Sequence, residues 1–168
     1  MRHSRGRTVA DSTVEMVEVV LPNDANPLGH MLGGRVMHLI DMAGAIAAHR
    51  HSRRHVVTAS VDYLDFAHPI RVGQLILLTA FVTRAFRTSM EIEVKVHMED
   101  YISGDRRQTS SAFLTFVALD KEGKPTPVPP LVLRTAAEKR RYREALTRRR
   151  WRLAMARRSH RRFLEKDS

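Results

Sequence analysis

The segment Gly34–Arg50, GRVMHLIDMAGAIAAHR, carries apolar side chains around most of its circumference when it is read as a helix. A helix that is apolar on nearly all sides is normally buried. One buried helix has to be covered by something large, and a sheet wrapped around it is the simplest cover. The rest of the chain is therefore expected to supply that sheet.

Segments with the alternation and the β-branched residues typical of strands lie on both sides of this helix. They are Thr13–Leu21, Val56–Phe66, Gln74–Arg84, Ser89–Glu99 and Gln108–Leu119. The connections Ala85–Thr88 and Asp100–Arg107 are short enough for antiparallel hairpins. The order is one strand, one buried helix and four strands in a largely antiparallel meander, which predicts a single α+β domain.

The net charge of +11 is confined to the ends of the 168-residue chain. Residues 1–13 carry +2, residues 14–133 carry −1 and residues 134–168 carry +10. We therefore expect a flexible basic N-terminus over 1–13, a folded body over 14–133 and a basic helical extension over 134–168. The absence of Cys, of a secretory leader and of any run near the roughly 18 apolar residues of a membrane span favours a soluble cytoplasmic protein.

Short motifs follow one another along the body in a characteristic order. They are DANPLGHMLGG at 24–34, MHLID at 37–41, VTASVD at 57–62, RTSM at 87–90 and AFLTFVALD at 112–120. Together they resemble the acyl-CoA hydrolase branch of the hotdog-fold thioesterases, which includes the brain-type acyl-CoA hydrolases and bacterial relatives. The resemblance covers about residues 14–133. It implies a hotdog fold, an antiparallel sheet wrapped around one central helix, to which this chain adds a basic C-terminal helix.

Three positions depart from the family pattern. His30 stands where relatives often carry Asn, Asp or Thr, and in some of them an Asn there assists catalysis. Phe86 stands where a Gly usually precedes Arg-Thr-Ser, and Ser110 stands where Asn is common. These departures leave open which group assists catalysis and how the ligand fits, whereas Asp41 is retained.

The pair Gly33-Gly34 lies where the loop enters the predicted helix. A helix start presents unpaired N–H groups and the positive end of the helix dipole, and glycine lets a ligand approach that backbone. These properties suit an oxyanion hole for a thioester carbonyl. The alternative is that Gly-Gly only permits tight packing of the helix on the sheet.

Asp41 lies seven residues after Gly34, about two turns along the same helix face. A carboxylate among apolar neighbours is costly unless it has a partner or a task. We assign Asp41 the activation of the attacking water, with direct nucleophilic attack on the thioester as one alternative. The other alternative is a structural carboxylate that bonds a neighbouring chain and holds a dimer together.

Asp41 and the helix start are about 10 Å apart along one helix, so we expect each site to take them from two protomers. The resemblance implies the same arrangement. Hotdog dimers place their sites at the subunit interface and commonly assemble further into hexamers, as trimers of dimers. Asn26 and His30, in the loop before the helix, would then face Asp41 of a second copy. His30 would orient the water or the carbonyl, or else it is a solvent-exposed loop histidine.

Binding of the coenzyme A portion is expected at Arg87, Thr88 and Ser89, with Thr58 as a further contact. Arg87-Thr88-Ser89 offers a cation, two hydroxyls and backbone donors to phosphate groups. Ordinary turn chemistry is the alternative explanation for Ser and Thr at that place. No cofactor is expected, since coenzyme A is part of the substrate and of the product.

Nine histidines raise the question of a metal site. His49, His51 and His55 cluster at the end of the predicted helix, but arginines lie between them and no carboxylate is near. A basic environment repels a cation, whereas positive charge suits a helix C-terminus. We therefore expect a solvated helix end and no metal.

The combined expectation is an enzyme that hydrolyses acyl-CoA to a free fatty acid and CoA. The rival is a non-catalytic acyl-CoA-sensing module that binds nucleic acid through its basic tail. The tail itself predicts a weakly amphipathic helix with an arginine-dense face. It would dock on the body, contact nucleic acid, attract the acidic CoA or touch a membrane surface. A solvated helix with no ligand is the remaining alternative.

Overall fold

The computed structural model describes residues 6–164, with side chains as far as Arg157. In chain order its elements are β1 (Arg7–Thr8), η1 (Ala10–Ser12), β2 (Val14–Val19), η2 (Pro22–Asp24), α1 (Gly33–Ser52), β3 (His55–Phe66), β4 (Leu75–Ala85), β5 (Ser89–Glu99), β6 (Arg106–Leu119), β7 (Leu131–Val132) and α2 (Ala136–Leu164). The α+β prediction is confirmed. The meander, however, is limited to β4, β5 and β6, because β3 crosses over to pair with β6 and the sheet order is β2-β4-β5-β6-β3.

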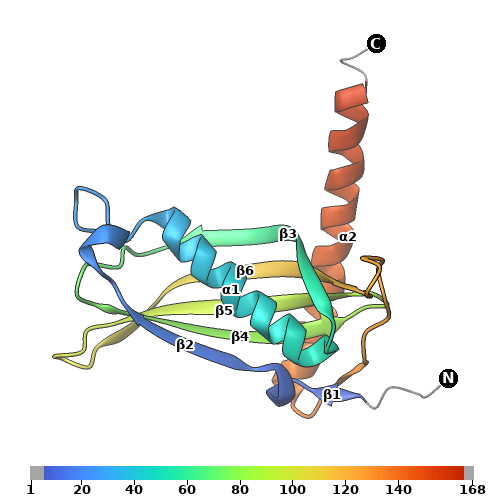
Figure 1. The fold of residues 1–168 in the computed structure, drawn as a ribbon, viewed down its shortest axis with the longest axis horizontal. Coiled ribbons are helices and arrows are strands. Elements are labelled where there is room, and N and C mark those ends of the chain that lie inside the picture. The colour runs from blue at the N-terminus through green and yellow to red at the C-terminus, as the bar shows by residue number, and fades with distance from the viewer. Residues whose placement is uncertain (1–5, 165–168) are drawn as a thin grey trace.

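The central helix α1 lies against one face of this antiparallel sheet, which curves around it (Figure 1). Apolar side chains from the helix and the strands form a single core: Leu39, Ile40, Ala43 and Ala47 with Ile76, Leu78, Ile92, Val94, Leu114 and Phe116. The approach is close at Gly44, where an added Cβ would come within 2.9 Å of the Phe116 ring. Helix and sheet are therefore in direct contact at β6.

The edge strand β3 carries two β-bulges that turn its side chains from one face of the sheet to the other. Its pairing with β6 skips Ala59 and then Asp62. A bulge leaves one residue unpaired and re-aims its neighbours. In consequence Thr58 bonds to α1 on the inner face, while Ser60 bonds to α2 on the outer face. The bend of β3 is visible in Figure 1.

Helix α2 packs on the outer face of the sheet and projects beyond it (Figure 1). Its contacts include ion pairs between arginines of the helix and carboxylates of the sheet: Arg148–Glu91 at 2.7 Å, Arg152–Asp62 at 3.3 Å and Arg141–Glu93 at 3.4 Å. The basic extension is thus a helix, as predicted, and it is docked on the body at least over residues 141–152.

The described part of the N-terminus is not a flexible arm. Arg7 and Thr8 pair in parallel with Leu131 and Val132, and Ser12 is fully buried. The expectation for 1–13 is therefore wrong over residues 7–12. Their order comes from pairing with a distant strand, which leaves no local pattern in the sequence. Residues 1–5 of that predicted segment lie outside the described residues.

Candidate active site

Asp41 lies midway along α1 on the side that faces β3. The Thr58 hydroxyl donates a hydrogen bond of 2.6 Å to Asp41 Oδ1. Asp41 is half-buried, and its second oxygen, Oδ2, makes no hydrogen bond with the residues that the structure describes. Thr58, expected as a contact for coenzyme A, is thus a direct partner of the predicted catalytic carboxylate.

The start of α1 is open toward the loop that precedes it. A Cβ added at Gly34 would meet nothing within 4 Å, and one added at Gly33 would meet only the Phe66 ring, at 3.6 Å. The first N–H groups of a helix have no partner within the helix. The backbone of Gly33-Gly34 can therefore be approached by a carbonyl oxygen, as an oxyanion hole requires.

Asn26 organises the loop in front of this helix start. Its side-chain Oδ1 accepts hydrogen bonds from the N–H groups of Leu28, at 3.0 Å, and His30, at 3.1 Å. Its Nδ2 makes no hydrogen bond with any residue that the structure describes and is available to a ligand. His30 is tied into the loop through its backbone, since its carbonyl accepts from the Asn26 N–H at 2.8 Å.

Asn26, His30 and Gly33 line one cleft of about 310 Å³ together with Phe66 and Ser110. The sequence-predicted residues of the loop and the helix start are therefore brought together. Asp41 does not line this cleft, because it lies roughly 10 Å farther along α1. A single protomer thus separates the two halves of the predicted site.

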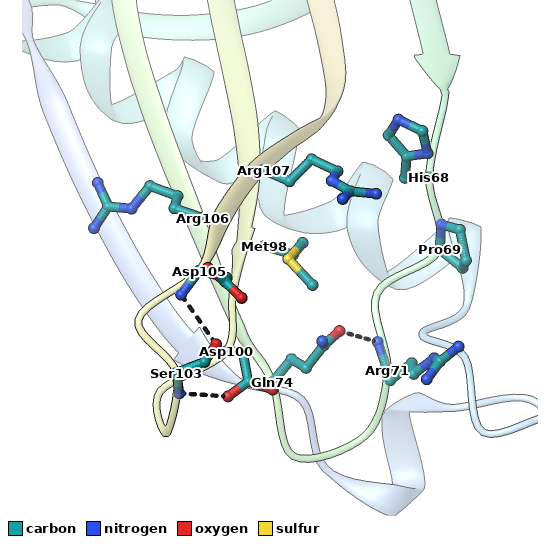
Figure 2. A pocket seen from close by; sticks show the side chains of 10 residues that line it. All are labelled: His68, Pro69, Arg71, Gln74, Met98, Asp100, Ser103, Asp105, Arg106 and Arg107. Carbon is teal, nitrogen blue, oxygen red and sulfur yellow. Dashed lines mark hydrogen bonds between the residues drawn. The ribbon is translucent and has the colours of Figure 1, made fainter.

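A larger cleft of about 530 Å³ adjoins the first and shares His68 and Pro69 with it (Figure 2). Its walls carry Arg71, Arg106 and Arg107. Arg106 is paired with Glu99 at 2.6 Å. Two aspartates, Asp100 and Asp105, line the same cleft. Sequence reasoning missed this charged cleft, because its residues come from different turns and strands and form no motif.

The Arg87–Ser89 turn lies across the sheet from Thr58. Ser89 pairs with Val117, which in turn pairs with Val57, the residue before Thr58. Two inter-strand spacings correspond to roughly 10 Å. The Arg87 side chain is exposed and makes no ion pair within the described part of the chain. The predicted CoA-binding turn therefore lies at the same end of the sheet as Thr58, whereas the Ser89 side chain, like that of Glu91 two residues on, belongs to the outer face that α2 covers.

Phe86, which replaces the usual Gly before this turn, has a partner on α2. The Arg149 guanidinium lies over its ring, 4.3 Å from the centroid. Arg84 approaches the same ring at 5.3 Å. This departure from the family pattern accompanies the docking of the basic helix.

The three histidines at the end of α1 do not converge. The His51 ring is fully buried, with Nε2 2.9 Å from the Pro129 carbonyl oxygen, and burial lowers the pKa of this side chain. His49 Nδ1 instead contacts the Arg54 carbonyl at 2.7 Å. The expectation of a solvated helix end is thus wrong for His51. Over residues 6–157, no group of three or more potential ligands could hold a metal ion.

None of the helices in the described region is both long and apolar enough to cross a membrane.

Comparison with known proteins shows the family to which the chain belongs. The thioesterase superfamily model matches residues 28–102. An uncharacterized acyl-CoA thioester hydrolase of Bacillus subtilis is 42% identical over 132 residues, which are 79% of this chain and 77% of the relative. The cytosolic acyl coenzyme A thioester hydrolase of Rattus norvegicus is 41% identical over 82% of this chain, which spans only 36% of that longer protein.

Solved structures extend the likeness to nearly the whole chain. An acyl-CoA hydrolase of Staphylococcus aureus, in complex with butyryl coenzyme A, coenzyme A and coenzyme A disulfide, superposes with a TM-score of 0.89 at 34% identity, covering 96% of this chain and 99% of that one. An apo-hexameric acyl-CoA thioesterase gives 0.88 at 41% identity, covering 90% and 97%. The chain therefore belongs to the hotdog-fold thioesterase superfamily, among its acyl-CoA hydrolases.

Proposed function

We propose that this protein hydrolyses acyl-CoA thioesters to a free fatty acid and CoA. The observation that carries the proposal is the Asp41–Thr58 hydrogen bond on a helix whose Gly33-Gly34 start is open to a ligand. The chain that carries both features belongs to a family of acyl-CoA hydrolases. Water is the only second reactant, so no cofactor is required.

The chemistry follows from the two halves of the site. Asp41 removes a proton from water, and the water oxygen attacks the thioester carbonyl carbon. The N–H groups at Gly33-Gly34 stabilise the negative charge that develops on the carbonyl oxygen, a contribution worth about 10²–10³ in rate per donor. The C–S bond then breaks, and the proton passes from Asp41 to the departing CoA sulfur. Thr58 holds one carboxylate oxygen and leaves the other for the water.

Each complete site combines two protomers in this proposal. Gly33 lies beside Phe66 at one end of β3, whereas Thr58 lies toward its other end. Antiparallel pairing of two copies of this edge strand places the helix start of one protomer beside the Asp41 of its partner. We infer a hexamer built as a trimer of such dimers, which the hexameric state of the apo thioesterase supports.

Asn26 is the proposed second polar group of the site. Three variants of the Staphylococcus aureus hydrolase replace an Asn, an Asp or a Thr by Ala. Their separations of 15 and 17 positions equal those between Asn26, Asp41 and Thr58 in this chain. This spacing supports Asn26, through its free Nδ2, in preference to the His30 side chain.

The CoA phosphates are assigned to Arg87, Thr88 and Ser89 of the protomer that supplies Asp41. This turn lies two strands from Thr58, within reach of the pantetheine arm. The cleft lined by Arg71 and Arg107 is the competing location. Replacing Arg87 by Ala is expected to raise KM for acyl-CoA, while Arg107→Ala leaves it unchanged; the reverse result moves the phosphates to the second cleft.

The test of the reaction is release of free thiol from acyl-CoAs of different chain length. Wild type turns over at least one of them, and Asp41→Asn loses at least a hundredfold in kcat. A protein without turnover on any chain length contradicts the proposal and supports the rival, a sensing module that binds nucleic acid through its tail. Full activity of Asp41→Asn would leave the reaction in place but remove Asp41 as the base.

A mixing experiment tests the shared site. Asp41→Ala and Asn26→Ala proteins are each expected to be inactive as homo-oligomers. Dissociating and reassociating a mixture creates dimers in which one site has both residues intact, so activity returns. Activity that never returns, despite exchange of subunits verified by mass, indicates that both residues serve a site within one chain.

We place this chemistry in the cytoplasm, as the cytosolic rat relative suggests.

A further inference from the structure

The bulged part of β3 is bound on the outer face of the sheet by one side chain of α2, Arg152. Arg152 Nη1 donates a hydrogen bond of 3.0 Å to the Ser60 hydroxyl, and its Nε lies 3.3 Å from Asp62 Oδ1. Ser60 itself donates to Asp62 Oδ1 at 2.6 Å, and Thr115 of β6 donates to Oδ2 at 3.1 Å. The Asp62 side chain is only 6% exposed, so these contacts are shielded from water.

These contacts lie at the two irregular positions of the strand. Ser60 immediately follows the unpaired Ala59, and Asp62 is itself the second unpaired residue. An unpaired residue has no ladder hydrogen bonds to fix it. Within the protomer β3 has only β6 as a neighbour, because it is the edge of the sheet. The Arg152 contacts therefore supply the constraint that the ladder lacks.

The same bulge sets the direction of Thr58. Thr58 precedes Ala59 and reaches Asp41 on the inner face, two residues from the Ser60 hydroxyl that Arg152 holds on the outer face. A small displacement of the backbone at this bulge would move the Thr58 hydroxyl away from Asp41 Oδ1. Errors of about 1 Å in the placement of a reacting group can cost as much as ~10² in rate.

We propose that Arg152 is a positioning residue for thioester hydrolysis, which it serves by fixing the β3 bulge that aims Thr58 at Asp41. This inference rests on the proposed role of Asp41. It gives the basic extension a task in the reaction, although Arg152 lies on the face of the sheet opposite to the site and touches no substrate.

The other docking arginines provide a matched control. Arg141 also pairs with a shielded carboxylate, Glu93, at 3.4 Å, but Glu93 belongs to β5, two strands away from β3. Arg152→Ala and Arg141→Ala therefore weaken the docking of α2 in similar ways. Only the first of them releases the bulge.

The experiment measures kcat, KM and thermal unfolding of both variants as full chains. Arg152→Ala is expected to lower kcat about 10- to 100-fold with little change in KM, while Arg141→Ala retains wild-type kcat. Arg152→Lys keeps the charge beside Asp62 and is expected to recover part of kcat. Adding Asp62→Ala to Arg152→Ala should lower kcat by less than the product of the two single effects, since the Arg152–Asp62 contact can be lost only once.

Three outcomes overturn the inference. Equal losses of kcat in Arg152→Ala and Arg141→Ala indicate general loosening of the helix. Unchanged kcat in Arg152→Ala with a lowered Tm indicates a purely structural contact. A large rise in KM alone indicates a role in binding. Failure of the role proposed for Asp41 would be seen in a different variant. Asp41→Asn would then retain activity, whatever the result for Arg152→Ala.

Discussion

The two faces of the central sheet are covered by helices of opposite character. The inner face holds α1 through apolar side chains such as Leu39 and Phe116, which are almost completely buried. The outer face holds α2 through arginines that reach carboxylates, among them Glu91, which is only 2% exposed. The contacts of α1 do not depend on ionisation, whereas those of α2 require both charges to be present.

Aromatic rings allow the charged face to pack closely. The Arg148 guanidinium lies 3.8 Å from the centroid of the Phe113 ring, and Arg141 lies 5.1 Å from that of Phe81. A guanidinium is planar and weakly hydrated, so it can stack on a ring while its N–H groups reach a carboxylate. A helix with few buried apolar side chains can therefore still cover a sheet.

The largest expected effect is on the inner face. Phe116→Ala removes a side chain that contacts both sheet and helix and leaves a cavity under Gly44, so it should lower the free energy of unfolding by about 3–5 kcal/mol. Phe113→Ala on the outer face serves as the comparison and should cost clearly less. Equal losses in urea titrations would mean that both faces are packed alike.

Arg148→Ala should have the next largest effect. Among the residues that the structure describes, it leaves Glu91 with only the Thr83 hydroxyl, at 2.7 Å, as a side-chain partner. An unpaired carboxylate in so shielded a place costs about 1–3 kcal/mol. Replacing both partners, with Arg148→Met and Glu91→Leu, should restore much of the stability measured in urea, because buried ion pairs are often replaceable by apolar side chains. A double variant weaker than the single one contradicts this view.

The stability of the protein in mild acid should depend on the buried His51, in the last turn of α1. Burial lowers its pKa below the ordinary 6.5, so the unfolded chain binds a proton at a higher pH than the folded one. Stability should therefore fall as the pH drops from about 6.5 toward the lowered pKa. His51→Gln keeps a donor for the Pro129 carbonyl and should flatten that part of the stability curve. An unchanged slope would assign it to other groups.

The smallest effect is expected on the side of α2 that faces water. Arg140 and Glu144 form an exposed pair at 3.7 Å, one helical turn apart. Such helix pairs typically contribute about 0.3–0.5 kcal/mol. Arg140→Ala should therefore leave Tm within experimental error of wild type, in contrast to Arg148→Ala. A loss as large as that of Arg148→Ala would show that α2 has further contacts on this side.

The sequence predicted those parts of the molecule that depend on local periodicity. The apolar circumference of α1 and the alternating strands identify the wrapped sheet, and the motif order places Asn26, Gly33 and Asp41. The hydrogen bond between Thr58 and Asp41 was not predicted, because two bulges in β3 break the alternation that shows which residues of a strand share a face.

Other features were beyond sequence reasoning because distant residues create them. The buried state of His51 depends on Pro129, and the docking of Arg152 depends on Asp62. The charged cleft at Arg71 and Arg107 joins a turn to the start of β6. In each case the individual residues look like ordinary surface residues in the chain, and only the crossover of β3 or the return of the Pro-rich segment brings them together.

The short parallel pair β1–β7 has a consequence for the order in which the molecule assembles. It joins positions roughly 120 residues apart, so its formation pays a loop-closure entropy that the local hairpins β4–β5 and β5–β6 avoid. The hairpins should form early and this pair late. Because β7 lies only a few residues before α2, the same pair also tethers the start of the docked helix to the N-terminal residues of the body.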